Sequence, residues 1–423
     1  MIARMNPAPR PGLRVAVLTP RLPPTGTPGG IATAHFNLFR ALRGAGWDAR
    51  AFAFEDAADS EDRFEVRRRA PRRLIEAVKT ACRLGLAVAS PFRFSYQLGE
   101  ALGGALAGRR ILEALERFRP DVIVSPDKGC PLAFARKPGG ARLIWIAHHN
   151  PVRFLGLDAS PPLSPLDARL AVAVESRELR QADLVLCPSR HVREEFLRTY
   201  RFDGPVEIFP NLISGELDDV RPGAPPLRAV LDLAADAPLF YLPAAGTTVK
   251  GGRLLAPLLA EIGRRHAQAG VFISGNVEHA HLPAVQSAPA NVRVYCPGPL
   301  PYLENLGRVS ECEVVLSPAM MENFSMALLE ATWLGVPVAA FAAGGIPEMI
   351  GTATEGCNGE TVAVGDVGAL CEAGASLLRR QRAGELTRAQ VAACTRERFS
   401  TARALERLEA LIRSLAGPAR SPQ

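Results

Sequence analysis

Eight short apolar runs, each followed by a glycine, a proline or a polar turn, place the strongest constraint on the fold of this chain. They are nearly continuous stretches of Val, Ile, Leu and similar residues, which is typical of strands buried on both faces of a parallel sheet. Between them, segments such as 32–46 and 251–270 repeat apolar residues every three or four positions, as helices do. The alternation predicts an α/β chain with doubly wound parallel sheets. The runs are RVAVLTP (14–20), DVIVSP (121–126), RLIWIAHHN (142–150), DLVLCPS (183–189), PLFYLPAAG (238–246), GVFISG (270–275), CEVVLSP (312–318) and VPVAAF (336–341).

The length and the grouping of these runs indicate two domains. A chain of 423 residues exceeds one ordinary domain, and the runs form two blocks on either side of residues 210–227, a stretch dense in Pro, Gly and Asp. We predict one Rossmann-like domain over residues 1–213, a second over 214–400, and a terminal amphipathic helix and tail over 401–423. Residues 1–213 carry 32 Lys and Arg against 22 Asp and Glu, whereas the remainder carries 18 against 21. This contrast predicts that any anion-attracting surface lies on the first domain.

Several classes of protein and site are disfavoured by patterns that the sequence lacks. The eight cysteines include no C-x-x-C pair and no Cys/His cluster with zinc spacing, so we expect no metal site, no disulfide framework and a cytoplasmic location. No uncharged apolar run reaches the roughly 20 residues that span a bilayer. The motifs of P-loop NTPases, dinucleotide-binding oxidoreductases and α/β-hydrolases are missing. No nucleic-acid-binding module accompanies the basic residues, so we expect no nucleic-acid partner.

The loops after the predicted strands form the candidate site, because ligands bind outside the carboxyl ends of parallel strands. Glu322 follows the run at 312–318 and precedes a helix that we predict over 324–334, ended by Gly335. The free N–H groups at the start of such a helix bind anions, and a diphosphate suits them well. Glu330 lies eight residues beyond Glu322, roughly 12 Å along a helix axis. Two carboxylates at that separation can accept hydrogen bonds from a hexose and from a ribose on either side of a diphosphate.

The block ENFSMALLEA (322–331), followed by GVPVAAF and GGIPEMI, resembles the E-x7-E block of retaining GT-B glycosyltransferases of family 4. Other segments resemble the same family in the same order, so the resemblance covers nearly the whole chain. It implies the GT-B fold, with two Rossmann-like domains facing across a cleft. It also implies transfer of a hexose or N-acetylhexosamine to an acceptor hydroxyl, with retention of configuration. The donor would be a nucleotide diphosphate sugar, usually a UDP-sugar, and no metal or other cofactor would be needed. The other segments are the Gly29–Gly30 turn, IAHHN (146–150), ADLVLCPS (182–189), FPNLIS (209–214) and LPAAGTTVKGG (242–252).

The resemblance assigns roles to the matching residues. Glu322 would contact the transferred sugar, together with His148 or its neighbour His149. Lys250, which follows the predicted strand at 238–246, would hold the diphosphate. Glu322, His148 and Lys250 are therefore the predicted catalytic residues. The predicted donor-binding groups are Lys250, Glu330 at the ribose, the glycines Gly29 and Gly30, and the backbone of Phe324, Ser325 and Met326.

Three departures from the family pattern keep alternatives open. Ala245 occupies the place of an arginine that would also hold the diphosphate, Leu212 replaces a hinge glycine, and Asn323 and Ser325 replace glycines near the sugar. The missing arginine is compatible with a noncatalytic protein that binds a sugar nucleotide. A GT-B nucleotide-sugar epimerase is a further alternative, which the E-x7-E block disfavours. The acceptor can be a glycan, a lipid-linked glycan or a small molecule.

Residues 63–94 form the most basic segment of the chain, with nine Lys and Arg but only two acids. The later part of the segment is amphipathic. It therefore fits either a solvated helix with a basic face or peripheral contact with anionic lipid at a membrane surface.

Overall fold

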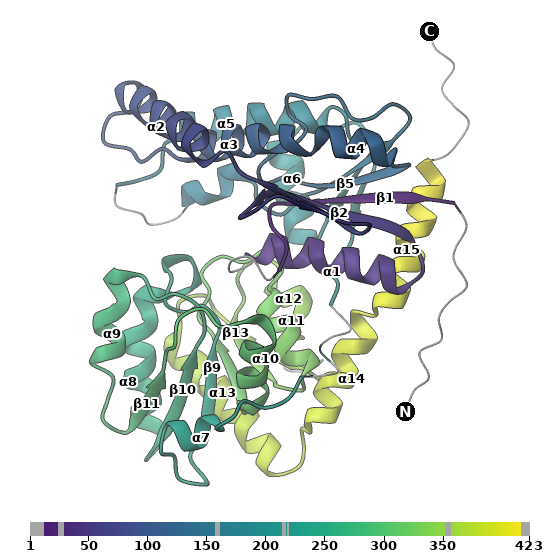
Figure 1. Cartoon of the computed structure of the whole chain (residues 1–423). Coiled ribbons are helices and arrows are strands. Elements are labelled where there is room, and N and C mark those ends of the chain that lie inside the picture. Colours follow the sequence, from purple (N-terminus) through teal and green to yellow (C-terminus); the bar gives the residue numbers. More distant parts are fainter. Residues whose placement is uncertain are drawn as a thin grey trace. The chain divides into compact units, whose positions relative to one another are not determined.

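Parallel sheets organise the chain, as the apolar runs predict. The computed structural model describes residues 12–23, 29–156, 161–213, 217, 220–351 and 357–415 (Figure 1). The chain divides into two units, which we describe separately. Unit 1 comprises residues 1–214 together with 401–423, and unit 2 comprises residues 215–400.

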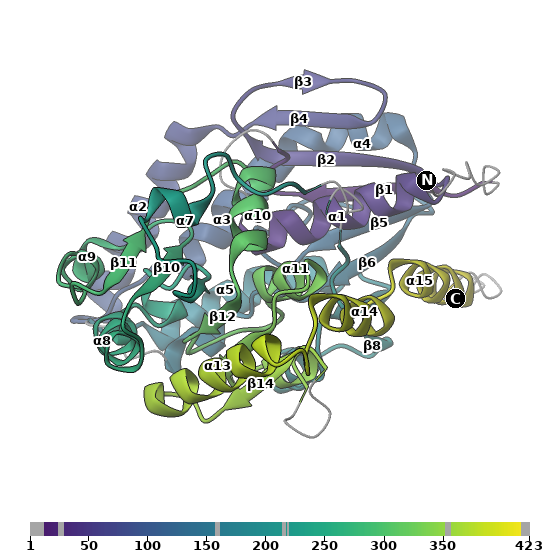
Figure 2. The ribbon, with the colours of Figure 1, turned by 90° about the horizontal axis from the view of Figure 1, so that it is seen from below.

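Unit 1 is built on an eight-stranded sheet with the order β3-β4-β2-β1-β5-β6-β7-β8 (Figure 2). All neighbouring strands are parallel except β3 and β4, which are antiparallel. The four predicted strands of this half are present, whereas β2, β3, β4 and β8 were not predicted. The bounds are β1 Arg14–Thr19, β2 Asp48–Asp56, β3 Ser60–Glu61, β4 Glu65–Arg69, β5 Val122–Pro126, β6 Arg142–Ile146, β7 Leu184–Cys187 and β8 Val206–Ile208.

Helices cover both faces of this sheet (Figure 1). Alternate residues of β1 take part in two apolar clusters, Val15 and Val17 on one face and Ala16 and Leu18 on the other. The first face packs against α1 and α15, and the second against α2, α3 and α4. The bounds are α1 Gly30–Gly44, α2 Arg72–Ala89, α3 Gln97–Gly108, α4 Leu112–Phe118, α5 Pro165–Leu179, α6 Arg190–Thr199 and α15 Thr401–Leu415, with 3₁₀ turns at Arg109–Ile111 and Pro151–Gly156.

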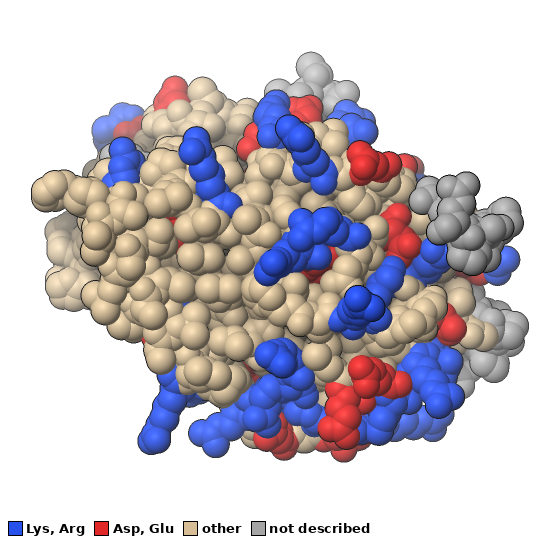
Figure 3. Space-filling model, turned by 90° about the horizontal axis from the view of Figure 1, so that it is seen from above, with Lys and Arg blue, Asp and Glu red and all other residues tan. Residues whose placement is uncertain are grey.

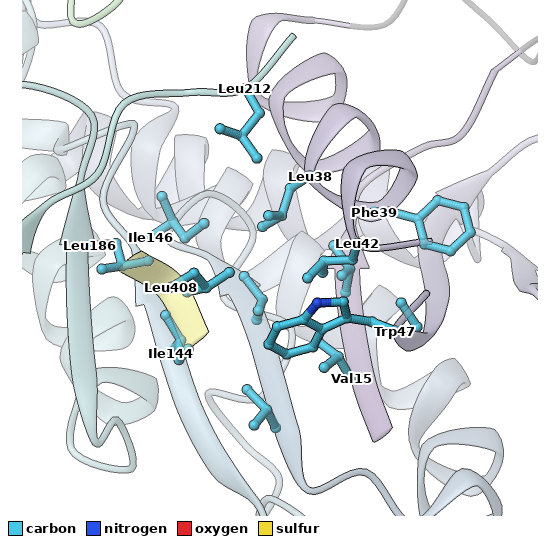
Figure 4. Close-up of a cluster of buried hydrophobic side chains, with 14 of the residues drawn as sticks. Val15, Leu38, Phe39, Leu42, Trp47, Ile144, Ile146, Leu186, Leu212 and Leu408 are labelled. Carbon is cyan, nitrogen blue, oxygen red and sulfur yellow. The ribbon is translucent and has the colours of Figure 1, made fainter. Parts of the chain in front are cut away.

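The C-terminal helix α15 belongs to the core of unit 1. Leu405, Leu408 and Ile412 recur at helical spacing and are buried in the cluster that contains Val15 and Ile144. Figure 4 shows Leu408 among strand residues of this cluster, with Trp47 in the same group. The amphipathic pattern of residues 401–415 therefore marks the part of α15 that closes one face of the sheet formed by the first half of the chain.

Unit 2 is built on a six-stranded parallel sheet with the order β11-β10-β9-β12-β13-β14. The predicted helix at 251–270 is shorter in the structure, because β10 already begins at Ala269. Gly374 of α13 lies so close to Leu316 of β12 that a Cβ would come within 2.5 Å of its side chain. The bounds are β9 Leu239–Leu242, β10 Ala269–Ile273, β11 Val292–Tyr295, β12 Val314–Ser317, β13 Val338–Phe341, β14 Gly359–Val362, α7 Leu227–Val230, α8 Leu255–Arg265, α9 Leu282–Gln286, α10 Tyr302–Glu311, α11 Met326–Trp333, α12 Ile346–Met349, α13 Val367–Arg382 and α14 Arg388–Arg398, with 3₁₀ turns at Thr248–Lys250, Gly252–Leu254 and His279–His281.

Two further observations concern the predictions on cysteines and membranes. Cys357 and Cys394 form a disulfide in unit 2, whereas sequence analysis expected no disulfide framework. The two residues are 37 positions apart, a separation that carries no recognisable signal in a single sequence. Across the described ranges, no helix is both long and apolar enough to cross a membrane.

We predict that Leu408→Ala destabilises unit 1 by about 2–5 kcal/mol, because it leaves a cavity under the sheet. Urea unfolding followed by tryptophan fluorescence measures this, since Trp47 and Trp145 are both buried in unit 1. Glu406→Ala is the matched control on the exposed side of the same helix and is expected to change stability by less than about 0.5 kcal/mol. Equal stabilities of the two variants would show that α15 does not complete this core.

Candidate functional site

Both sheets have a switch point at which the chain reverses its direction of strand addition. In unit 1, β1 lies between β2 and β5, and in unit 2, β9 lies between β10 and β12. Loops at the carboxyl ends of such strands diverge and leave a crevice, where ligands bind in open α/β sheets. The predicted residues cluster after these strands, Gly29 and Gly30 after β1, Lys250 after β9 and Glu322 after β12.

Two loops of unit 2 bring Lys250 and Glu322 together. Gly251 has φ of 92°, and a Cβ there would lie 2.2 Å from the carbonyl oxygen of Pro318. The N–H of Met320 donates to the carbonyl oxygen of Val249 at 3.1 Å, so the loop after β9 and the loop after β12 are joined by their backbones. The Lys250 ammonium consequently forms an ion pair with the Glu322 carboxylate. The structure thus unites two residues that lie 72 positions apart in the sequence.

The Glu322 carboxylate is held in place from several sides. Its side chain is only 11% exposed, whereas that of Lys250 is 31% exposed. The N–H of Asn323 donates to Oε1 of Glu322 at 3.2 Å, and the N–H of Gly345 donates to the Glu322 carbonyl oxygen at 3.1 Å. The turn after β13 therefore supports the loop after β12, and the cation and carboxylate are fixed at the carboxyl edge of β9 and β12.

The helix after Glu322 begins later than predicted. It starts at Met326 rather than at Phe324, so the estimate of 12 Å between the two glutamates, which assumed a continuous helix, does not hold. The N–H of Ser325 donates to Sδ of Met349 at 3.2 Å, and the Phe324 ring packs edge-on against Phe399. Met326 is the first helical residue, so its N–H has no acceptor within the helix. No acidic side chain occupies the first turn and no side chain caps it, so α11 presents uncapped donors after Glu322.

Glu330 is buried on α11, where its carboxylate accepts a hydrogen bond. The Tyr302 hydroxyl, at the start of α10, donates to Oε1 of Glu330 at 2.9 Å. Burial raises the pKa of Glu330 to about 7, against the opposing effect of the Tyr302 hydrogen bond. Sequence analysis missed Tyr302, because a tyrosine at a helix start has no distinguishing pattern. Ala245, which stands where the family has an arginine, is fully buried and carries no charge.

In unit 1 the glycine turn borders a cavity of 370 Å³. Gly29 is the N-cap of α1 and Gly30 is its first residue. A Cβ on either glycine would meet nothing within 4 Å, so packing does not require glycine at these positions. The open backbone is therefore accessible to a ligand in the cavity. The charged lining residues are Arg21, Glu55, Lys79, Glu100 and Lys128, and sequence analysis assigned a role to none of them.

These charged groups come from different elements and are of both signs. Lys79 of α2 forms an ion pair with Glu100 of α3 at 2.7 Å. Glu55 stands at the end of β2, and burial raises the pKa of its carboxyl, while Lys128 and Arg21 oppose that rise. A cavity with two carboxylates and three cations suits a ligand rich in hydroxyl or amino groups better than an apolar one.

His148 is buried at the end of β6. Burial lowers the pKa of His148 well below its ordinary value, so the imidazole is neutral at pH 7 and can act as a hydrogen-bonding group rather than a cation. Its ring meets that of His35 on α1 edge-on, with centroids 5.4 Å apart. Oδ2 of Asp127 accepts the backbone N–H of His148 at 2.6 Å and that of His149 at 2.5 Å. Asp127 thereby fixes the turn that carries both histidines.

The neighbouring His149 faces a buried acid instead. Its Nδ1 lies 3.6 Å from Oε1 of Glu175, and burial lowers the pKa of His149 to about 4. Glu178, one turn further along α5, accepts from the Ser125 hydroxyl at 2.5 Å and from the Leu132 N–H at 2.7 Å. Burial raises the pKa values of Glu175 and Glu178 to about 8. The described residues include no group of three or more His, Cys, Asp or Glu side chains that could hold a metal ion.

We predict that Glu178→Gln flattens the pH dependence of stability. A carboxyl whose pKa is raised on folding contributes stability that is complete below about pH 4.5 and is lost as pH rises through about 8. Glutamine reproduces the protonated form, because its amide can donate to Ser125 and accept from Leu132. At pH 9 the free energy of unfolding of the variant is therefore expected to exceed that of the wild type by roughly a few kcal/mol, as the raised pKa implies. Thermal unfolding from pH 6 to pH 9 measures this.

The control for that experiment is Glu116→Gln, on the exposed side of α4. It is expected to keep the wild-type pH profile. A residual slope in Glu178→Gln is expected from Glu175, which remains buried. Parallel profiles of wild type and Glu178→Gln would contradict the protonated state that we assign to Glu178 near pH 7.

Models of known protein families match both units of the chain. The family model described as Glycosyltransferase Family 4 matches residues 28–216, and the one described as Glycosyl transferases group 1 matches residues 226–396. A curated 2-deoxystreptamine N-acetyl-D-glucosaminyltransferase from Streptomyces fradiae is 25% identical over 264 residues, covering 60% of this chain and 62% of that enzyme. The match thus spans less than two thirds of that relative.

Solved structures of similar fold cover nearly the whole chain. Sucrose-phosphate synthase from Thermosynechococcus elongatus is 18% identical, with a TM-score of 0.68, and the alignment covers 96% of this chain and 99% of that one. Anabaena HepE, solved in complex with UDP and glucose, is 17% identical, with a TM-score of 0.62 and coverage of 95% and 100%. These neighbours share the GT-B arrangement of two parallel-sheet α/β units in one chain. With family models matched in both units, this chain belongs to the group 1, family 4 glycosyltransferases and has the GT-B fold.

Proposed function

We propose that this glycosyltransferase moves a hexose or an N-acetylhexosamine from a nucleotide diphosphate sugar to an acceptor hydroxyl, with retention of configuration. The proposed donor is a UDP-sugar. The observation that carries the proposal is the Lys250–Glu322 ion pair at the switch point of unit 2, directly before the uncapped start of α11. A cation and a helix N-terminus together suit a diphosphate. HepE is solved with UDP-glucose, and the Streptomyces relative is named for N-acetyl-D-glucosaminyl transfer, which supports this choice of donor.

The proposed division of labour follows the environments of the groups. Lys250 and the N–H groups at Met326 would stabilise charge on the departing diphosphate, so no metal ion is needed in this proposal. Glu322, freed from Lys250 by the incoming phosphate, would accept hydrogen bonds from sugar hydroxyls. Glu330 would accept the ribose hydroxyls at the far end of the nucleotide. His148 keeps its predicted catalytic role as a neutral hydrogen-bonding group.

We propose that the acceptor is polar and binds in the 370 Å³ cavity of unit 1. Glu55 and Glu100 would accept hydrogen bonds from its hydroxyl or amino groups, and Lys128 would contact oxygens. The Streptomyces relative is named for a 2-deoxystreptamine acceptor, which carries groups of this kind, and that supports the proposal. The buried Ala245 in place of a family arginine favours one rival, a sugar-nucleotide-binding protein without transfer activity.

We predict opposite effects on transfer and binding for the two members of the ion pair. Glu322→Gln is expected to lower kcat/KM by about 100-fold or more, because it loses a contact to the reacting sugar. Its affinity for UDP is expected to stay the same or increase, since Lys250 no longer has a competing carboxylate. Lys250→Met is expected to weaken UDP binding about tenfold. Release of nucleoside diphosphate measures transfer, and calorimetry measures binding.

Glu304→Gln is the matched control, since Glu304 is exposed on α10 of the same unit. It is expected to behave as wild type in both measurements. Wild-type transfer rates in Glu322→Gln would remove Glu322 from the mechanism. UDP binding without turnover across a panel of acceptors would favour the noncatalytic rival. The same assay with a chelator tests metal independence, and the anomeric configuration of the product, read by NMR, tests retention.

We predict that affinity for UDP-glucose falls as pH is lowered through about 7, where Glu330 gains a proton. The carboxylate can accept two ribose hydroxyls, whereas the protonated form loses part of that capacity. UDP-glucose is the suitable probe, because its diphosphate does not titrate near pH 7. Glu330→Gln is expected to bind more weakly at pH 8 and to show a flat profile. An unchanged profile in the variant would separate Glu330 from the nucleotide.

A further inference from the structure

Helix α2 of unit 1 has two apolar faces, only one of which is covered. Ile75 and Leu86 are its buried residues and lie on the side that faces α3. The contact is close, since a Cβ on Gly103 of α3 would lie 2.9 Å from Cγ2 of Ile75. This face accounts for the packing of α2 in the unit.

The second apolar face is exposed along the whole helix. Leu74, Leu84 and Val88 are 52%, 66% and 86% exposed, and Ala77 and Ala81 are also exposed. These five positions follow one another at intervals of three, four, three and four residues, so they form a single stripe about 100° wide. Phe92, in the turn after the helix, is 91% exposed and has φ of 65°. Such a continuous stripe differs from the singly scattered apolar residues that ordinary surfaces carry.

Two of the exposed arginines border this stripe. Arg72, Arg73, Arg83 and Arg93 are exposed, whereas Glu76 is the sole acid between residues 70 and 94. Arg73 lies beside Leu84 and Ala77 on the helix surface, and Arg93 lies next to Phe92, whereas the other two lie on the side of Lys79. Figure 3 views unit 1 from the side of α2, α3 and α4, with α2 toward the left, and shows a broad uncharged area bordered by Lys and Arg. The apolar ridge and the charges around it are therefore complementary to a surface that is apolar inside and anionic at its edge.

We propose that α2 and the turn after it, residues 72–94, dock onto an anionic lipid surface, with Leu74, Leu84, Val88 and Phe92 inserted among the acyl chains. A helix with an exposed apolar face and arginines at its border lies in the plane of a membrane interface, and its cations contact lipid phosphates. A protein partner fits less well, because a convex ridge one helix long, about 27 Å, offers little of the area that a stable interface buries.

Helix α2 also contributes a residue to the lining of the 370 Å³ cavity of unit 1. Lys79 lies on the side of α2 away from the apolar stripe and lines the cavity with Glu100. Docking would hold that cavity close to the lipid headgroups, where an acceptor carried by a lipid is presented. The docking itself does not depend on the proposed transfer reaction, since it rests on residues outside both candidate sites.

Vesicle flotation tests the proposal with the full-length chain. We expect binding to vesicles of phosphatidylcholine with phosphatidylglycerol at low salt, weaker binding at high salt, and no binding to phosphatidylcholine alone. The double variant Leu84→Gln/Val88→Gln is expected to lose binding by at least about tenfold, and Arg73→Glu/Arg93→Glu by a similar factor. Because all four side chains are exposed, circular dichroism is expected to show wild-type folding.

The controls are Leu197→Gln and Leu303→Gln on α6 and α10. These two leucines are 48% and 49% exposed, and their variants are expected to bind vesicles as wild type does. No flotation with anionic vesicles at low salt would overturn the proposal. So would binding that the double variant retains. If light scattering shows a dimer that Leu84→Gln/Val88→Gln dissociates, the stripe binds a second copy of the chain and the proposal is overturned. Release of nucleoside diphosphate with a water-soluble acceptor measures transfer separately, so a failure of docking can be told from a failure of the proposed reaction.

Discussion

The contact between Gly251 and Pro318 determines the geometry on which the candidate site of unit 2 depends. A side chain at position 251 would meet a backbone carbonyl, which cannot move aside as a flexible side chain can, and the positive φ adds strain for any residue with a Cβ. Glycine therefore allows the loop after β9 to lie against the loop after β12. Since the two strands are neighbours at the switch point, this approach places a lysine and a glutamate in contact before any ligand arrives. Such preassembly reduces the ordering that binding requires.

Burial divides the two glutamates of the E-x7-E block into different chemical groups. Glu322 lies on a loop at the mouth of the site and is balanced by Lys250. Glu330 is enclosed by α10 and α11, with the Tyr302 hydroxyl as its partner, and its pKa lies near 7. One carboxylate is thus paired with a cation, and the other is enclosed in the protein and has a pKa in the physiological range. In unit 1, burial shifts the pKa of His148 in the opposite direction, downward, and so favours the neutral form of that side chain as well.

Sequence reasoning found the strands that are continuous apolar runs, because helices cover both of their faces. It missed β2 and β4, which lie inside the sheet of unit 1 but carry charged residues among the apolar ones, and it missed the edge strands. The edge strands β3, β8, β11 and β14 are short and mixed in composition, since one side of each is unpaired, and such segments resemble loops. The start of α11 was predicted two residues early, because Phe324 has helical periodicity but its ring packs against Phe399, a contact made by tertiary structure.

The cavity of unit 1 and the exposed stripe of α2 mark the limit of periodicity as a signal. Glu55, Lys79, Glu100 and Lys128 come from a strand, two helices and a loop, and no local pattern relates them. In α2, the pattern identifies an amphipathic helix but cannot say which apolar residues are covered. Ile75 and Leu74 are neighbours of equal hydrophobic character, yet one packs against Gly103 and the other lies in solvent. Exposed large apolar side chains lower the solubility of a protein. A continuous stripe of them that the fold leaves uncovered therefore indicates a site that binds another apolar surface.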